Sequence, residues 1–235
     1  MQLKKSLVVF LLTIVAFSCK QRATQTDNLF KFKGHISYTT SGLVSVTSPI
    51  TINLVKAVDS WQPNEEILTN AIRISPKVSG KLISKNANQL VFIPKNPLKA
   101  DTEYTVTVNL KDIYETMPKG FESYTFQFKT FKPNFSVITN DLQSYSKEWL
   151  YIDGIIKLAD MVRLEDAKTI IEASQNNKDL SLKWDESIET ARIFEFKIDS
   201  IHRDIDDSKV TTNWNGKSIN ANNKGENTMI IPGIN

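Results

Sequence analysis

The sequence predicts an all-β protein made of two tandem antiparallel β-sandwich domains that follow an N-terminal signal segment. Three observations predict this fold. From residue 33 onwards, short runs of alternating apolar and polar residues recur about every ten residues, as in half-buried strands. None of these runs develops into a long stretch with helical periodicity. The second half of the chain repeats the rhythm of the first after a break near Pro133.

The N-terminal segment predicts export. A short basic stretch that ends at Lys5 precedes a mostly apolar, uncharged run from Ser6 to Phe17, which has the length of a signal-peptide core. Cys19, the only cysteine, follows. The whole segment resembles a bacterial lipoprotein signal, so we expect residues 1–18 to be the signal peptide, Cys19 to carry the lipid and residues 19–32 to be a polar tether. The alternative is an ordinary secretory signal with an incidental cysteine.

Composition narrows the class of protein. The sequence has only eight glycines and eight prolines in 235 residues and no low-complexity run, which is typical of a globular chain. The formal charge of +3 falls to +1 if the signal peptide is removed, because Lys4 and Lys5 leave with it. No basic patch with interleaved aromatic residues remains, so we expect no nucleic-acid partner.

The first predicted domain spans residues 33–131. Its clearest strand is Tyr104–Leu110, in which four apolar side chains alternate with polar ones. The spacing of Leu98, Thr102 and Tyr104 resembles the tyrosine corner of immunoglobulin-like sandwiches, whose hydroxyl bonds to upstream backbone. A plain strand-turn-strand is the alternative. The other strands are expected at His35–Tyr38, Leu43–Val46, Ile50–Leu54, Ile72–Ile74, Lys81–Ser84, Leu90–Ile93 and Tyr124–Phe128.

The second predicted domain spans residues 132–235. Strands are expected at Trp149–Ile156, Leu180–Trp184, Phe194–Ile198 and Val210–Trp214. A short amphipathic stretch covers Leu164–Ala173, and Asn215–Gly216 predicts a tight hairpin because both residues tolerate positive φ. Its counterpart in the first domain is Glu66–Ile74. Setting Ser75 on Ser174 gives an offset of 99 residues, which suggests an array of similar modules.

No catalytic or metal-binding set of residues is predicted. His35 and His202 are far apart in the sequence, whereas a metal site needs clustered ligands. The acidic segment Asp204–Ser208 fails the calcium-loop pattern, because Lys209 stands where glycine is required and Asn215 where glutamate is required. We expect a solvated acidic turn there, with a loose calcium site between modules as the alternative.

Enzyme motifs are also missing from the sequence. It has no Gly-x-Ser-x-Gly elbow, glycine-rich phosphate loop or His-Glu-x-x-His motif. The adjacent carboxylates of Glu65–Glu66 and Asp185–Glu186 point apart in an extended chain, which suits exposed turns. We therefore expect a non-enzyme without a cofactor. The four tryptophans could stack on sugars, but at strand spacing they more often pack in a core; they are Trp61, Trp149, Trp184 and Trp214.

Two passages resemble a known family. Pro76–Gly80 and Leu90–Pro94 resemble the P-x-V-x-G turn and the L-x-F-x-P strand of a bacterial Ig-like module. Val210–Gly216 and Ile230–Gly233 resemble the macroglobulin-type domain that follows in alpha-2-macroglobulin lipoproteins of the Bacteroidetes type. The resemblance implies two Ig-like or macroglobulin-type antiparallel β-sandwich domains.

The resemblance also implies a function, namely a lipid-anchored module of a protease inhibitor that traps its target proteases. The sequence has neither the thioester motif Cys-x-Glu-Gln nor a recognisable bait segment, so trapping would need downstream domains of a larger chain. The expected location is the cell envelope, as an outer-membrane lipoprotein that faces the periplasm or the cell surface. Expected partners are the membrane, through acylated Cys19, and target proteases or other envelope proteins. The alternatives are a binding module for glycans or a protein partner, and a structural spacer.

Overall fold

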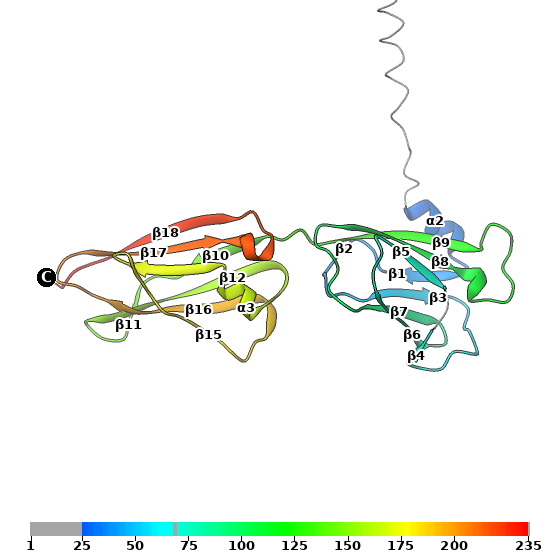
Figure 1. The fold of residues 1–235 in the computed structure, drawn as a ribbon, viewed down its shortest axis with the longest axis horizontal. Helices are drawn as coiled ribbons and strands as arrows, with labels where there is room; N and C mark the ends of the chain where they lie inside the picture. Colours follow the sequence, from blue (N-terminus) through cyan, green and yellow to red (C-terminus); the bar gives the residue numbers. More distant parts are fainter. Residues whose placement is uncertain (1–24, 68–69, 235) are drawn as a thin grey trace, which may run out of the picture.

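The computed structural model describes residues 25–67 and 70–234. Strands dominate these residues and form four sheets, in agreement with the predicted all-β class. The sheets are grouped into two units that lie one after the other along the long axis of the molecule (Figure 1). Each unit has its own hydrophobic cluster, formed by residues between Phe32 and Phe128 in the first and between Phe135 and Ile231 in the second.

The first unit consists of a five-stranded and a four-stranded sheet. The order in the larger sheet is β1 (Ile36–Thr39), β3 (Ile50–Leu54), β7 (Gln89–Pro94), β6 (Gly80–Asn86) and β4 (Glu65–Glu66). The order in the smaller sheet is β2 (Leu43–Val44), β9 (Ser123–Thr130), β8 (Glu103–Asn109) and β5 (Ile72–Ser75). Every pair is antiparallel except β2–β9, which is parallel. A 3₁₀ turn, η1 (Leu110–Asp112), follows β8.

Strand β8 shows how the sequence alternation builds the first core. Tyr104, Val106 and Val108 are 2%, 0% and 0% exposed, while the threonines between them lie on the other face. The Tyr104 ring stacks on Phe128 with 5.3 Å between centroids. Its hydroxyl accepts a hydrogen bond from the backbone N–H of Lys99 at 2.9 Å, which confirms the predicted tyrosine corner.

The N-terminal part of the described chain differs from the predicted tether. Residues Gln25–Phe32 form helix α2, and Phe32 is only 2% exposed. The Phe32 ring lies 5.2 Å from those of Phe121 and Tyr124, and the Lys31 ammonium donates to the carbonyl of Gly120. The tether prediction was wrong for residues 25–32 because these partners lie about 90 residues away in the sequence. Residues 1–24, including the predicted signal peptide and Cys19, lie outside the described residues.

The second unit also pairs two sheets, both antiparallel. The first contains β10 (Phe135–Thr139), β12 (Trp149–Arg163), β16 (Thr190–His202) and β15 (Leu182–Trp184), with β11 (Gln143–Ser144) beside β12. The second contains β14 (Lys178–Asp179), β13 (Ile171–Gln175), β17 (Ser208–Asn215) and β18 (Lys224–Ile231). Helix α3 (Leu164–Lys168) and the 3₁₀ turn η2 (Gly216–Ile219) lie in connections.

Two local predictions for the second unit need correction. The amphipathic stretch Leu164–Ala173 is not one element, because α3 ends at Lys168 and β13 begins at Ile171. The tight hairpin at Asn215–Gly216 is replaced by η2 and a longer connection to β18. Gly216 is needed there for space, since a Cβ would lie 2.5 Å from the Phe135 ring, while the left-handed position falls on Asn220 at φ 58°.

The two units share one strand order. β1-β3-β7-β6 in the first corresponds to β10-β12-β16-β15 in the second, and β9-β8-β5 corresponds to β18-β17-β13. Buried cross-strand pairs match as well, because Ile50 lies opposite Phe92 and Leu150 lies opposite Ile201. The repeat in the sequence therefore corresponds to a repeat of topology.

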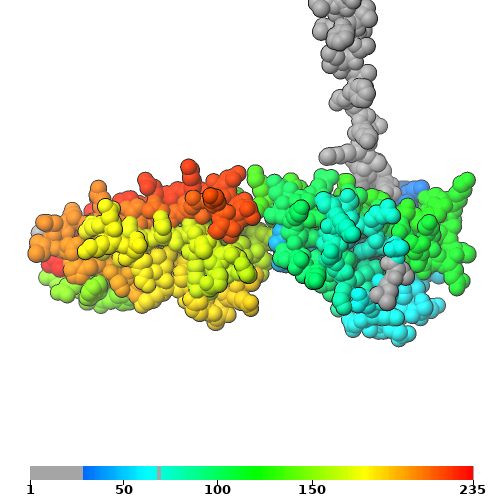
Figure 2. Space-filling view, viewed as in Figure 1, coloured from blue at the N-terminus to red at the C-terminus, as the bar shows by residue number. Residues whose placement is uncertain are grey.

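Side chains connect the units across residues 131–134. The Asp160 carboxylate, from β12, accepts a hydrogen bond from the backbone N–H of Val46 at 2.8 Å. The Arg192 guanidinium lies 5.6 Å from the centroid of the Phe131 ring. A small cavity of ≈ 100 Å³ is lined by residues of both units. The space-filling view shows the two units meeting at this junction (Figure 2).

Candidate binding surface

The four tryptophans differ sharply in their surroundings. Trp61 packs against the first core, and Trp184 and Trp214 pack against the second. The Trp184 ring lies 5.5 Å from Phe196. Trp149 belongs to neither core and is 45% exposed. Trp149 is therefore the tryptophan that the fold leaves available to a ligand.

Trp149 belongs to an aromatic strip, which we define as Tyr145, Trp149 and Tyr151. Trp149 and Tyr151 alternate with the buried Leu150 along β12, so both lie on the outward face of the sheet. Tyr145, which is 56% exposed, stacks on Tyr151 with 4.4 Å between centroids and 29° between planes. The Trp149 ring makes an edge contact with the imidazole of His202 at 5.0 Å.

Two ion pairs lie beside the strip. Lys183, Lys197 and Asp153 occupy one row across β15, β16 and β12. The Lys197 ammonium lies 3.6 Å from the Asp153 carboxylate and 3.9 Å from the centroid of the Tyr151 ring. Lys183 pairs with Asp199, whose side chain is 8% exposed. The hydrogen bond and charge of Lys183 hold the pKa of Asp199 below its ordinary value, and Asp199 raises the pKa of Lys183 in turn.

Strand β16 has a β-bulge beside the aromatic strip. Leu150 and Ile152 are two residues apart on β12, but their partners on β16, Ile201 and Ile198, are three apart. Ser200, in the bulge, has a positive φ of 59°, which costs a residue other than glycine about 1 kcal/mol or more. Bulges of this kind bend a strand and re-aim the side chains beside them.

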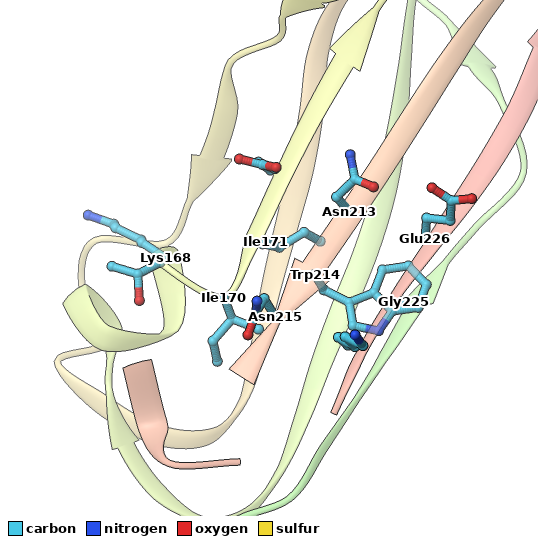
Figure 3. Close-up of a pocket in the computed structure, with 11 residues that line it drawn as sticks. Lys168, Ile170, Ile171, Asn213, Trp214, Asn215, Gly225 and Glu226 are labelled. Carbon is cyan, nitrogen blue, oxygen red and sulfur yellow. The ribbon is translucent and has the colours of Figure 1, made fainter. Parts of the chain in front are cut away.

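A larger groove lies on the other sheet of the second unit, beside α3 (Figure 3). It has a volume of ≈ 970 Å³, and Glu172, Asn213 and Glu226 form one row across β13, β17 and β18 on its floor. At its edge the Lys168 ammonium is bonded to Glu165 and Glu186. These pairs raise the pKa of Lys168, so this amine stays protonated and is not a base near neutral pH.

The structure separates the two histidines. His35 lies in the first unit with its ring 5.1 Å from Phe121. His202 lies in the second unit, where its Nδ1 is 2.8 Å from the Asp204 carboxylate. The acidic turn that begins at Asp204 contributes to an open groove, and the Asp207 carboxylate accepts from the N–H of Gly233. Within residues 25–67 and 70–234, no group of three metal-ligating side chains is brought together.

The adjacent carboxylates point to separate local partners. Glu65 accepts from the backbone N–H of Gln62, and Glu66 pairs with Lys81. Asp185 accepts from the hydroxyl and N–H of Ser187, which lower its pKa, and Glu186 pairs with Lys168. The two carboxylates of each pair therefore have different partners.

Sequence reasoning named Trp149 but missed the strip around it. The alternation of Trp149, Tyr151 and Asp153 with apolar residues could have placed these three side chains on one face. Tyr145 and Lys197 could not have been added, because strand pairing alone brings them to this face.

Among the residues that the structure describes, no helix is long and apolar enough to pass through a membrane. No curated protein matches the sequence. L,D-transpeptidase 3 from Mycobacterium tuberculosis, in complex with a faropenem-derived adduct, is 11% identical with a TM-score of 0.29, over 73% of this chain and 77% of that chain. A chimeric titin Z1Z2 functionalised with a KLER exogenous peptide from decorin is 12% identical with a TM-score of 0.33, over 86% and 98%.

The family comparison concerns the first unit. Residues 37–130 match the model of a bacterial Ig-like domain. These residues extend from β1 to the end of β9, so they include every strand of both sheets of that unit. The first unit is therefore similar to a bacterial Ig-like domain over residues 37–130.

Proposed function

We propose that this chain is a non-catalytic, lipid-anchored β-domain module of the bacterial cell envelope. The observation that carries the proposal is the repeated strand order in two units joined end to end by side-chain contacts. Two units joined in this way would hold the parts at their two ends at a set distance and in a set orientation. Bacterial Ig-like domains occur in surface or envelope proteins, which supports the same location for this chain.

The lipid anchor is the first part of the proposal to test. Cys19 would carry the acyl chains, and each buried methylene contributes about 0.8 kcal/mol to membrane affinity. Wild type should fractionate with membranes, and Cys19→Ala should appear in the soluble fraction of the envelope. Cys19→Ala that remained in the membrane fraction would refute the anchor. Protease treatment of intact cells would then report whether the protein faces the surface or the periplasm.

We further propose that the chain serves an alpha-2-macroglobulin-like protease inhibitor. Tandem β-sandwich modules and the sequence motifs of residues 76–80 and 210–216 support this role. The full-length protein would trap the protease, and this part would hold the trap near the membrane. Incubation of the full-length protein with an active protease should produce a compaction shift on a native gel. A catalytically inactive form of the same protease is the control, and an equal result with both would contradict trapping.

A further inference from the structure

We propose that the aromatic strip of the second unit is a binding site for a neutral glycan, with sugar rings stacked on Trp149 and Tyr145. The site lies on the outward face of β12 and β16, and the row of Lys183, Lys197 and Asp153 borders it. This inference does not depend on protease trapping, because it concerns one sheet face of one unit.

The internal repeat shows that the fold does not require these rings. The pairs Ile52–Leu90 and Asn53–Gln89 in the first unit match Ile152–Ile198 and Asp153–Lys197 in the second. With this correspondence, the first unit has Pro49 and Thr51 at the positions of Trp149 and Tyr151. A sandwich with the same strand order forms without aromatic residues there. Exposed rings that the architecture does not need call for another explanation.

The bulge is a second feature that only the second unit has at this place. Strand β7 has one residue, Val91, between Leu90 and Phe92. At the matching place, β16 has two residues, Asp199 and Ser200, between Ile198 and Ile201. Ser200 has a φ of 59° in this bulge, and Asp199 beside it pairs with Lys183. Strained backbone is retained where the surroundings enforce it, and functional sites are its common location.

The chemistry of the strip fits a neutral sugar. A pyranose presents an apolar C–H face, which an exposed ring can cover, and a rim of hydroxyl groups that both donate and accept. Lysine ammoniums supply donors beside the rings, and aspartate carboxylates supply acceptors. Lys183 and Lys197 are each paired with a carboxylate, so neither of these two ammoniums is a free cation for a phosphate or another anion.

The same row of charges argues against a protein partner. Protein interfaces of standard size bury about 800 Å² on each side, and their centres are depleted in charged residues. Here four charged side chains lie beside the rings of Tyr145 and Tyr151; they are Asp153, Lys183, Lys197 and Asp199. A small surface on which apolar faces and hydrogen-bonding groups alternate suits a sugar better.

Affinity electrophoresis tests the proposal with four soluble neutral polysaccharides as probes: laminarin, xyloglucan, galactomannan and glycogen. Wild-type protein should be retarded in a native gel that contains at least one of them. Trp149→Leu, which keeps an apolar side chain but removes the ring, and Tyr145→Ala should each weaken binding at least tenfold. Tyr38→Ala is the matched control, because Tyr38 is an equally exposed aromatic residue (51%) on the first unit.

Thermal melting of every variant shows whether a loss of binding is caused by unfolding. Trp149 and Tyr145 lie outside the core, so the midpoints should stay within a few degrees of wild type. Should Trp149→Leu melt much earlier, Tyr145→Ala alone decides the outcome. Retardation by none of the four polysaccharides would overturn the proposal, as would binding that survives both substitutions or is lost equally in Tyr38→Ala.

Discussion

The hydroxyl of Tyr104 holds the connection between β7 and β8 against the first sandwich. It accepts from the N–H of Lys99, and the carbonyl of the same lysine accepts from the Thr130 hydroxyl at 2.6 Å. Both backbone groups of Lys99 are therefore satisfied by residues of β8 and β9. This pairing fixes the turn at the end of the unit that faces the junction.

Tyr104→Phe should destabilise the first unit by about 1 to 3 kcal/mol, because the Lys99 N–H loses its acceptor while the ring can keep its stacking on Phe128. Urea denaturation measures the loss. Tyr38→Phe, on an exposed residue, should change the free energy of unfolding by less than about 0.5 kcal/mol. Equal values for the two variants would show that the corner contributes no stability.

Asp199 gives the second unit a predicted pH dependence. Lys183 lowers the folded-state pKa of Asp199, so the ion pair contributes stability above the unfolded-state value of about 3.9. This contribution is lost as the pH falls from there through the folded-state pKa. Asp199→Asn should therefore be less stable than wild type near pH 7, and the difference should shrink in acid. Urea denaturation between about pH 3 and pH 7 tests it, with the exposed Asp141→Asn as control. A gap that stayed constant with pH would contradict the pairing.

For single residues, the sequence predicted burial wherever the alternation along a strand determines it. Alternation placed Tyr104 and Val106 in the core correctly. It could not separate Trp149 from Trp214, because both stand at strand spacing. Trp214 rests against Gly225 of the adjacent strand, whereas Trp149 makes an edge contact with His202 and stays 45% exposed. Cross-strand partners decide which of the two rings is covered.

Among the elements, β12 exceeds its predicted length. Alternation is clear only to Ile156, yet the strand continues to Arg163. Its last residues pair with the start of β16, after an irregularity that follows Lys157. The extension carries Asp160, whose carboxylate contacts the first unit. The extension follows from the pairing of β12 with β16, and no local pattern in the sequence indicates this pairing.

Helix α2 offers a direct test of the corrected N-terminal boundary. Phe32→Ala should destabilise the first unit by about 3 to 5 kcal/mol, because a buried ring in contact with Phe121 and Tyr124 is removed. Phe30→Ala on the same helix is the matched control, since Phe30 is 72% exposed. Thermal or urea unfolding measures both variants. Equal stability of the two would return residues 25–32 to the role of a tether.

For the whole molecule, the junction determines how rigidly the two units are held. Asp160→Ala removes the bond to the Val46 N–H, and we expect a broader distribution of angles between the units. Small-angle X-ray scattering should show a more variable maximum dimension, with unchanged melting of each unit. Asp141→Ala, an exposed aspartate away from this contact, should scatter like wild type. Identical curves for both variants would mean that the Asp160 bond does not hold the orientation.

The division into domains at residues 33–131 and 132–235 stays a prediction. Separate hydrophobic clusters favour independent folding. A fragment of residues 25–131, which keeps Phe32, should unfold cooperatively on its own, and so should residues 132–235. A fragment that begins at residue 33 should be less stable. Failure of either larger fragment to fold would show that the two clusters form one cooperative unit.

The parallel pair β2–β9 has a mechanical consequence. It joins a strand near the start of the first unit to the strand at its end, through bonds from Lys129 N–H to Gly42 and from Phe131 N–H to Val44. Tension on the ends of this unit pulls these strands in opposite directions, so the bonds share the load and rupture together. Within residues 135–231, the first strand pairs with β12 and the last with β17, with no ladder between them. A stretched molecule should therefore extend its second unit at the lower force.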